Sequence, residues 1–199
     1  IRLISTTDLE VRNDIIKATN RQTQVSDEQL FALSEFPKKL EVYFSSHQAS
    51  RKLYFERRSR QYNSVEGIEK VRIINMTTVI RTFSSAFLEL PHRATRNYKA
   101  LVQSLGNDIC NDTHRIEMYY SAALIHYRLE YLYRSQYIST TYKVARYHMQ
   151  MAFRILGMKL TNLPPKNSNE MKRRCESLTE LLWDEIEYKK IFDKVVDVI

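Results

Sequence analysis

The chain has 199 residues and a formal net charge of +8, with 43% hydrophobic and 27% charged residues. This balance is ordinary for a folded protein with a buried core, while three glycines and four prolines are too few for an all-β chain with frequent tight turns. No apolar run reaches the roughly 20 residues of a membrane span, and no signal peptide is visible. We therefore expect a mainly α-helical, cytoplasmic protein without a membrane segment.

Three features of the sequence indicate the context in which the protein works: its cysteines, its first residue and its charge. Cys110 and Cys175 are the only cysteines, so we expect reduced thiols and no cysteine-based zinc site. The sequence opens on Ile1 rather than methionine, and we expect it to be a piece of a longer protein. The basic surplus favours an anionic partner such as nucleic acid.

Residues 1–62 predict the end of a small mixed α/β domain. Arg2–Ser5 has the composition of a short strand, and a helix capped at Thr7 or Asp8 follows it. A polar loop then leads to Ser26, whose spacing to the next polar residues fits a capping box and opens a second helix.

Residues 63–199 predict a helical domain that follows this α/β element. The first expected helix stops at Leu90, because the residue before a proline disfavours helical geometry. The segment around Pro164-Pro165, near 162–169, reads as a linker. The apolar stripes predict helices over 69–90, 92–105, 113–137 and 140–160, and a last helix from 168 to beyond Phe192.

A stripe of large side chains runs through the tyrosine-rich segment 110–162. Its members, Tyr120, Leu124, Tyr127 and Tyr131, recur at helical spacing, which is more typical of a core or a helix–helix interface than of a binding platform. We expect the arginines of the same helices on their solvent side, namely Arg128, Arg134, Arg146 and Arg154.

A run of alternating basic and aromatic residues is the first candidate site. Cations beside aromatic rings suit phosphate contacts combined with base stacking. In the alternative interpretation, Tyr54 and Phe55 belong to a buried strand, Glu56 pairs with a neighbouring arginine, and the remaining residues form a solvated face. The candidate nucleic-acid-binding residues are Arg51, Lys52, Tyr54, Arg57, Arg58 and Arg60.

A polar loop containing Thr19, Asn20 and Gln22 is the second candidate site. Side-chain amides both donate and accept hydrogen bonds, so these residues suit a polar pocket for a ligand. In the alternative, Thr19 and Asn20 only cap helix ends and Gln22 lies in solvent.

The sequence carries no motif for catalysis, for a metal ion or for a cofactor. His47, His92, His114, His126 and His148 lack the spacing of paired metal ligands. No Gly-rich phosphate loop and no Gly-x-Ser-x-Gly elbow is present. We therefore predict no catalytic, metal-binding or cofactor-binding residue in this sequence.

Three segments together resemble the abortive infection phage resistance (AIPR) family. They are IIKATNRQTQVSDEQLFAL, KKLEVYF and LYFERR, and with the stretch from Lys70 to Ala94 the resemblance covers roughly residues 10–100. The family's Thr-Asn-x-Gln loop is also similar to a loop of ParB/sulfiredoxin-like domains, whose nucleotide-handling pocket needs a Gly-Gln segment that is absent here. The matching positions are Thr19, Asn20, Gln22, Ser26, Leu40, Glu41, Phe44, Tyr54, Glu56, Arg57 and Arg58.

The resemblance implies a bacterial protein of antiphage defence. We expect a fragment of such a protein that binds or senses nucleic acid through its basic surface. One alternative is a helical protein-interaction or oligomerisation module of a defence complex, whose tyrosine stripes and charge-balanced terminal helix bind a protein partner or a second copy. Another is part of a nuclease or NTPase effector whose catalytic motifs precede Ile1.

Overall fold

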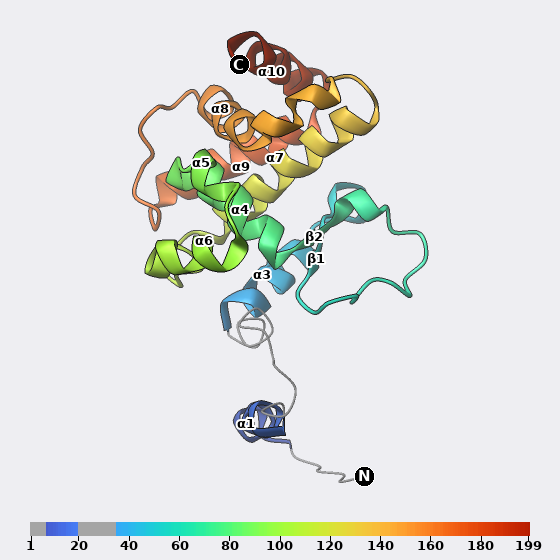
Figure 1. The fold of residues 1–199 in the computed structure, drawn as a ribbon, viewed down its shortest axis with the longest axis vertical. Coiled ribbons are helices and arrows are strands. Elements are labelled where there is room, and N and C mark those ends of the chain that lie inside the picture. Colours follow the sequence, from blue (N-terminus) through green and yellow to red (C-terminus); the bar gives the residue numbers. More distant parts are fainter. Residues whose placement is uncertain (1–6, 20–34) are drawn as a thin grey trace.

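The computed structural model describes residues 7–19 and 35–199, and this part of the chain is mainly α-helical, as predicted (Figure 1). Short 3₁₀ helices lie between the α-helices: η2 (Ala49–Arg51), η3 (Lys70–Arg72), η4 (Gly106–Asp108) and η5 (Thr140–Ala145). The α-helices are α1 (Leu9–Thr19), α3 (Glu35–Ser45), α4 (Met76–Leu88), α5 (Pro91–Ala94), α6 (Tyr98–Leu105), α7 (Ile116–Arg134), α8 (Arg146–Met158), α9 (Asn169–Trp183) and α10 (Glu185–Val198).

A two-stranded parallel sheet joins the N-terminal part to the helices. Strand β1 (Tyr54–Glu56) pairs with β2 (Ile73–Asn75), and the buried Phe55 lies opposite the buried Ile74. The strand expected around Tyr54 and Phe55 is confirmed, whereas the one expected at residues 2–5 falls outside the described residues. The helix expected over 69–90 was predicted to start too early. Residues 73–75 include two β-branched isoleucines and pair with β1, so α4 begins only after Asn75.

Side-chain caps break two of the expected helices. Asn97 Oδ1 accepts hydrogen bonds from the backbone N–H groups of residues 99 and 100, so the helix expected over 92–105 becomes α5 and α6. Asp184 caps α10 in the same way, at 3.0 and 3.1 Å, and ends α9 one residue earlier. At both positions the expected continuous helix is replaced by a bend that the cap stabilises. The predicted linker near 162–169 lies between α8 and α9.

Helix α7 lies at the centre of the hydrophobic core. It packs against α4, α8, α9 and α3 (Figure 1). The Tyr119 ring stacks on Phe83 of α4 at 4.0 Å, and the Tyr120 ring meets Phe44 of α3 edge to face at 5.0 Å. The tyrosine stripe therefore belongs mainly to the core, as its helical spacing indicates. The division into two domains at residue 62 stays a prediction.

Two of the four arginines expected on the solvent side of these helices are buried. Arg154 is 0% exposed, and its guanidinium donates to Ala86 O at 2.7 Å, Leu160 O at 3.1 Å and Glu89 Oε1 at 2.5 Å. Arg128 is 9% exposed, whereas Arg134 lies in solvent as expected. Arg154 can be buried because backbone and carboxylate acceptors replace water around its guanidinium inside the helix packing.

Candidate nucleic-acid interface

Arg57 lies in a polar cluster that fixes the start of the loop after β1. Its Nε donates to Glu41 Oε2 at 2.7 Å, and Gln61 Nε2 donates to Glu41 Oε1 at 2.7 Å. Gln61 Oε1 in turn accepts from the backbone N–H groups of Arg57 and Arg58, both at 3.1 Å. The Arg57 side chain is only 11% exposed. Arg57 therefore orders the loop that carries the next two cations.

The Glu41 carboxyl responds electrostatically to these contacts. Partial burial raises its pKa, but the hydrogen bonds from Arg57 and Gln61 outweigh this effect and leave the pKa below its ordinary value. The carboxylate is therefore held in its charged form, as expected for a charge-assisted pair. Glu41 and Arg57 both belong to the segments that resemble the AIPR family, and their contact ties α3 to β1.

Arg58 and Arg60 are exposed on the loop that follows β1. Neither guanidinium forms an ion pair within the described part of the chain. Arg60 has a φ of +63°, a left-handed conformation that is uncommon for a residue with a side chain. Backbone hydrogen bonds from Gln61 to Arg58 O and from Asn63 to Arg60 O hold the turn. This arrangement presents two guanidinium groups to solvent from an ordered loop.

The N-terminal part of the basic run divides between two environments. Arg51 Nη1 pairs with Glu180 Oε2 of α9 at 2.6 Å, although the Arg51 side chain remains half-exposed. Lys52 Nζ lies 5.3 Å from the centroid of the Tyr54 ring, and this ring meets Tyr62 edge to face at 5.5 Å. The structure thus brings Lys52 and the two tyrosines together, but it turns Arg51 toward α9 and Arg57 toward α3.

The polar loop cannot be placed in the same way. Asn20 and Gln22 lie outside the described residues, and Thr19 is the last residue of α1, with a side chain that is likewise outside the description. Their proposed role in a polar pocket remains a prediction from the sequence.

Arg72, which lies in η3, borders the basic run and was missed at the level of sequence. Its Nη1 donates to Ser50 O at 3.1 Å and to Lys52 O at 3.4 Å, and its Nε contacts Glu69 at 3.4 Å. Its guanidinium carbon lies 5.8 Å from the centroid of the Trp183 ring. Arg72 therefore connects the segment before β1 to the end of α9.

Arg128, in α7, faces the same aromatic rings as Arg72. Its Nε donates to Leu182 O at 2.6 Å. The guanidinium carbon lies 5.0, 4.6 and 4.7 Å from the ring centroids of Tyr127, Trp183 and Tyr188, respectively. The sequence holds one available signal for this site, the lone tryptophan at the end of a helix, but it does not reveal that two arginines meet there.

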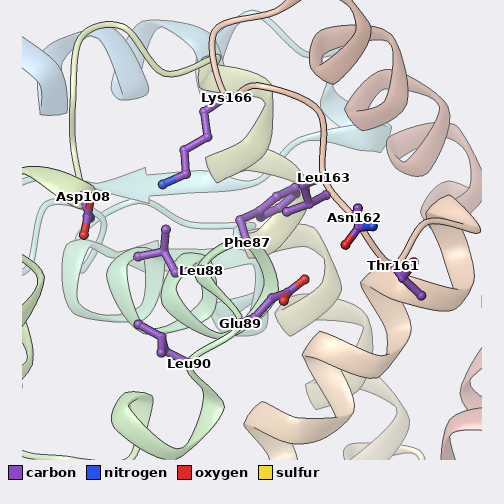
Figure 2. A pocket seen from close by; sticks show the side chains of 9 residues that line it. All are labelled: Phe87, Leu88, Glu89, Leu90, Asp108, Thr161, Asn162, Leu163 and Lys166. Carbon is purple, nitrogen blue, oxygen red and sulfur yellow. The ribbon is translucent and has the colours of Figure 1, made fainter.

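A pocket of about 460 Å³ opens at another place, between the end of α4 and the α8–α9 connection. Figure 2 shows the acidic Glu89 and Asp108 and the basic Lys166 among its lining side chains. Its mixed charges point to no single class of ligand, and none of the residues predicted from the sequence lines it. Its lining residues are Phe87, Leu88, Glu89, Leu90, Asp108, Thr161, Asn162, Leu163 and Lys166.

Residues 7–19 and 35–199 contain neither a metal-binding cluster nor a membrane-spanning helix. No three histidine, cysteine or acidic side chains are grouped there so that they could hold a metal ion. Within the same ranges, no helix has both the length and the apolar composition needed to cross a lipid bilayer.

Comparison with known proteins gives one match. No curated protein and no solved structure matches the chain. The family model described as AIPR protein matches residues 1–199, the whole of the sequence. This match extends well beyond residues 10–100, over which the sequence motifs resemble the family, and the chain therefore belongs to the AIPR family.

Proposed function

We propose that this part of an abortive-infection, antiphage defence protein binds nucleic acid in the bacterial cytoplasm through the surface around β1. The family supports the role in phage defence. The binding proposal rests on one observation: Arg58 and Arg60 project from a loop that the Glu41–Arg57–Gln61 cluster holds in place. An ordered loop loses little conformational entropy on binding, so its cations contact phosphates at lower cost.

The residues of the basic run then have separate roles. Arg58, Arg60 and Lys52 contact phosphate oxygens, and the neighbouring Tyr54 offers its ring to a base. Arg57 positions the loop, because its own guanidinium already bonds Glu41. Arg51 contributes positive charge from its half-exposed side chain while it pairs with Glu180.

The interaction-module alternative has less support. It assigns partner binding to the tyrosine stripe and the terminal helix, yet within the stripe Tyr120 is 0% and Tyr127 is 2% exposed. Tyr131 is the member of the stripe with the largest exposed fraction. Most side chains of the tyrosine stripe therefore fill the protein's own core and do not face a partner.

Binding of the purified chain to single- and double-stranded DNA and RNA, measured over a salt series, tests the proposal. We expect affinity to fall steeply with salt, because binding releases counterions from the phosphates. The double charge reversal Arg58→Glu/Arg60→Glu should weaken binding about tenfold or more and reduce the salt slope by about two. The matched control is the double reversal Arg96→Glu/Arg134→Glu, which changes the net charge equally at two exposed arginines away from β1.

The control should stay within about twofold of the unmodified chain, because a contact-specific site responds to position and not to total charge. An equal loss in both variants would show a diffuse charge effect and would contradict the proposed surface. Absence of binding to every nucleic acid at low salt would refute the proposed function.

A further inference from the structure

Two arginines share the same pair of aromatic rings at the junction of α7, α9 and η3. The Arg72 guanidinium carbon lies 5.6 Å from the Tyr127 centroid and 5.8 Å from the Trp183 centroid. The corresponding distances for Arg128 are 5.0 and 4.6 Å. Ring faces attract cations, but two cations over the same rings repel each other. Burial lowers the pKa of Arg128 below its ordinary value, and the charge of Arg72 lowers it further.

The carboxylates nearby pair with only one of these two cations. Arg72 contacts Glu69 at 3.4 Å through Nε, whereas Arg128 forms no ion pair within the described part of the chain. Glu185, whose charge acts on Arg128, is itself paired with Lys189 at 2.6 Å. A cation that is 9% exposed and lacks a partner is costly, because burial removes most of its hydration.

Hydrogen-bond donors around Arg128 are also left without acceptors. Tyr188 Oη is buried and has no hydrogen-bond partner among the described residues. Trp183 Nε1 is buried as well and meets no acceptor there with regular hydrogen-bond geometry, although it lies close enough to the Tyr120 hydroxyl to lower the pKa of that group. The Nε atom of Arg128 donates a hydrogen bond to Leu182 O. Its two terminal nitrogens donate none to the described residues, but they are not fully buried, so they reach solvent. Native structures satisfy nearly all buried polar groups, so each exception needs an explanation.

We propose that the arginine–aromatic cluster, formed by Arg72, Arg128, Tyr127, Trp183 and Tyr188, binds a phosphate group. A phosphate supplies both missing elements, negative charge for the two guanidinium groups and acceptor oxygens for the idle donors. The phosphate belongs either to a nucleic-acid backbone or to a free phosphate compound such as a nucleotide.

The position of the cluster links it to the proposed nucleic-acid surface without depending on it. Arg72 Nη1 donates to Lys52 O, so the cluster adjoins the basic run. With a backbone phosphate, the inference deepens the proposed function. With a free phosphate compound, the site stands even if the chain binds no nucleic acid.

Fluorescence of Trp183 provides a direct readout, because Trp183 is the only tryptophan in the sequence. We would titrate the chain with inorganic pyrophosphate and, separately, with a ten-nucleotide oligothymidylate at constant ionic strength. A saturable change in emission is expected with at least one of the two probes. Pyrophosphate alone would identify a free phosphate compound as the source, and the oligonucleotide alone would identify the backbone.

The Tyr188→Phe variant separates binding from folding. The hydroxyl that this variant removes has no hydrogen-bond partner in the described part of the chain, so the midpoint of urea unfolding should stay equal or rise. Binding of the active probe should nevertheless weaken at least threefold, and Arg72→Gln should weaken it at least tenfold. The control Arg134→Gln changes an exposed arginine on α7, the helix that carries Arg128, and should change binding less than twofold.

Each outcome separates this inference from the proposed function. If neither probe changes Trp183 emission at millimolar concentration, the inference is overturned. It is also overturned if the oligonucleotide binds and both Tyr188→Phe and Arg72→Gln bind as well as the unmodified chain, a result that leaves the proposed function intact. Pyrophosphate binding without binding of any nucleic acid supports the inference and removes the proposed function.

Discussion

Arg154→Met is the substitution for which the structure predicts the largest loss of stability. Arg154 is 0% exposed and joins the end of α4 to the segment after α8 through Ala86 O and Leu160 O. Its remaining terminal nitrogen pairs with Glu89. Methionine fills a similar volume but carries no donor, so it removes all three hydrogen bonds while keeping most of the packing.

The expected size of the loss follows from the groups left behind. An unsatisfied buried carbonyl costs roughly 1–3 kcal/mol, and Arg154→Met leaves two carbonyls without this donor, those of Ala86 and Leu160. Glu89 is 48% exposed, so water replaces part of its lost contact. Removing the buried charge and adding apolar burial offsets some of the cost. We expect a net loss of about 3 kcal/mol in the free energy of unfolding.

Urea unfolding followed by circular dichroism measures this loss. For a slope of about 3 kcal/mol/M, the midpoint should fall by about 1 M. Arg154→Lys keeps the charge but not the planar fork that bonds three acceptors, so its urea midpoint should lie between those of Arg154→Met and the unmodified chain. The control Arg134→Met changes an exposed arginine and should cost less than about 0.5 kcal/mol. A loss below about 1 kcal/mol for Arg154→Met would refute the structural role assigned to the buried guanidinium.

Three further substitutions test other parts of the structure. Glu41→Gln should cost about 1 kcal/mol at pH 7. Because the pKa of Glu41 is lowered in the folded state, its contribution is lost as the pH falls through that folded-state pKa, and the urea midpoints of the variant and the unmodified chain should converge at acid pH. Burial, and after it the charge of Arg146, lowers the pKa of His126 to about 4 from its ordinary 6.5. Protonation therefore favours the unfolded chain, so stability present above pH 6.5 should fall by up to about 3 kcal/mol toward pH 4. His126→Asn should remove that part of the pH dependence, and an unchanged slope between pH 7 and 5 would contradict it. Gly157→Ala places a Cβ 2.7 Å from Leu178 Cδ1, and overpacking should outweigh the gain in helix propensity by about 1 kcal/mol; a higher melting temperature would show that Leu178 moves aside freely.

The parts of the fold that depend on local periodicity were predictable from the sequence. Tyr120, Leu124 and Tyr127 belong to the stripe predicted from helical spacing, and all three lie in the core. Asn97 and Asp184 were read as positions within long helices, although each caps a new helix. A polar residue in a periodic segment suits either a helix surface or a cap, and packing against other elements decides between them.

The candidate site was predictable only where it is made of neighbouring residues. The run from Arg51 to Arg60 is visible as a sequence pattern, and its exposed members follow from local chain geometry. The contacts that set Arg128 apart are long-range, since its bonded carbonyl at Leu182 is 54 residues away. Arg154 likewise bonds Ala86 across 68 residues. Helical spacing predicts which face a residue occupies, but not whether that face meets acceptors or water.

The contrast between these two buried arginines is what makes Arg128 informative. Arg154 has acceptors in three directions, including a carboxylate, so its burial is explained by the protein alone. Arg128 has one backbone acceptor and three aromatic neighbours, and a second cation shares two of those rings. If both arginines were buried only to fill space in this fold, both guanidinium groups should have a similar set of hydrogen-bond acceptors. The unequal satisfaction places the missing acceptor at the end of α9, beside the basic run, and not in the pocket next to Glu89.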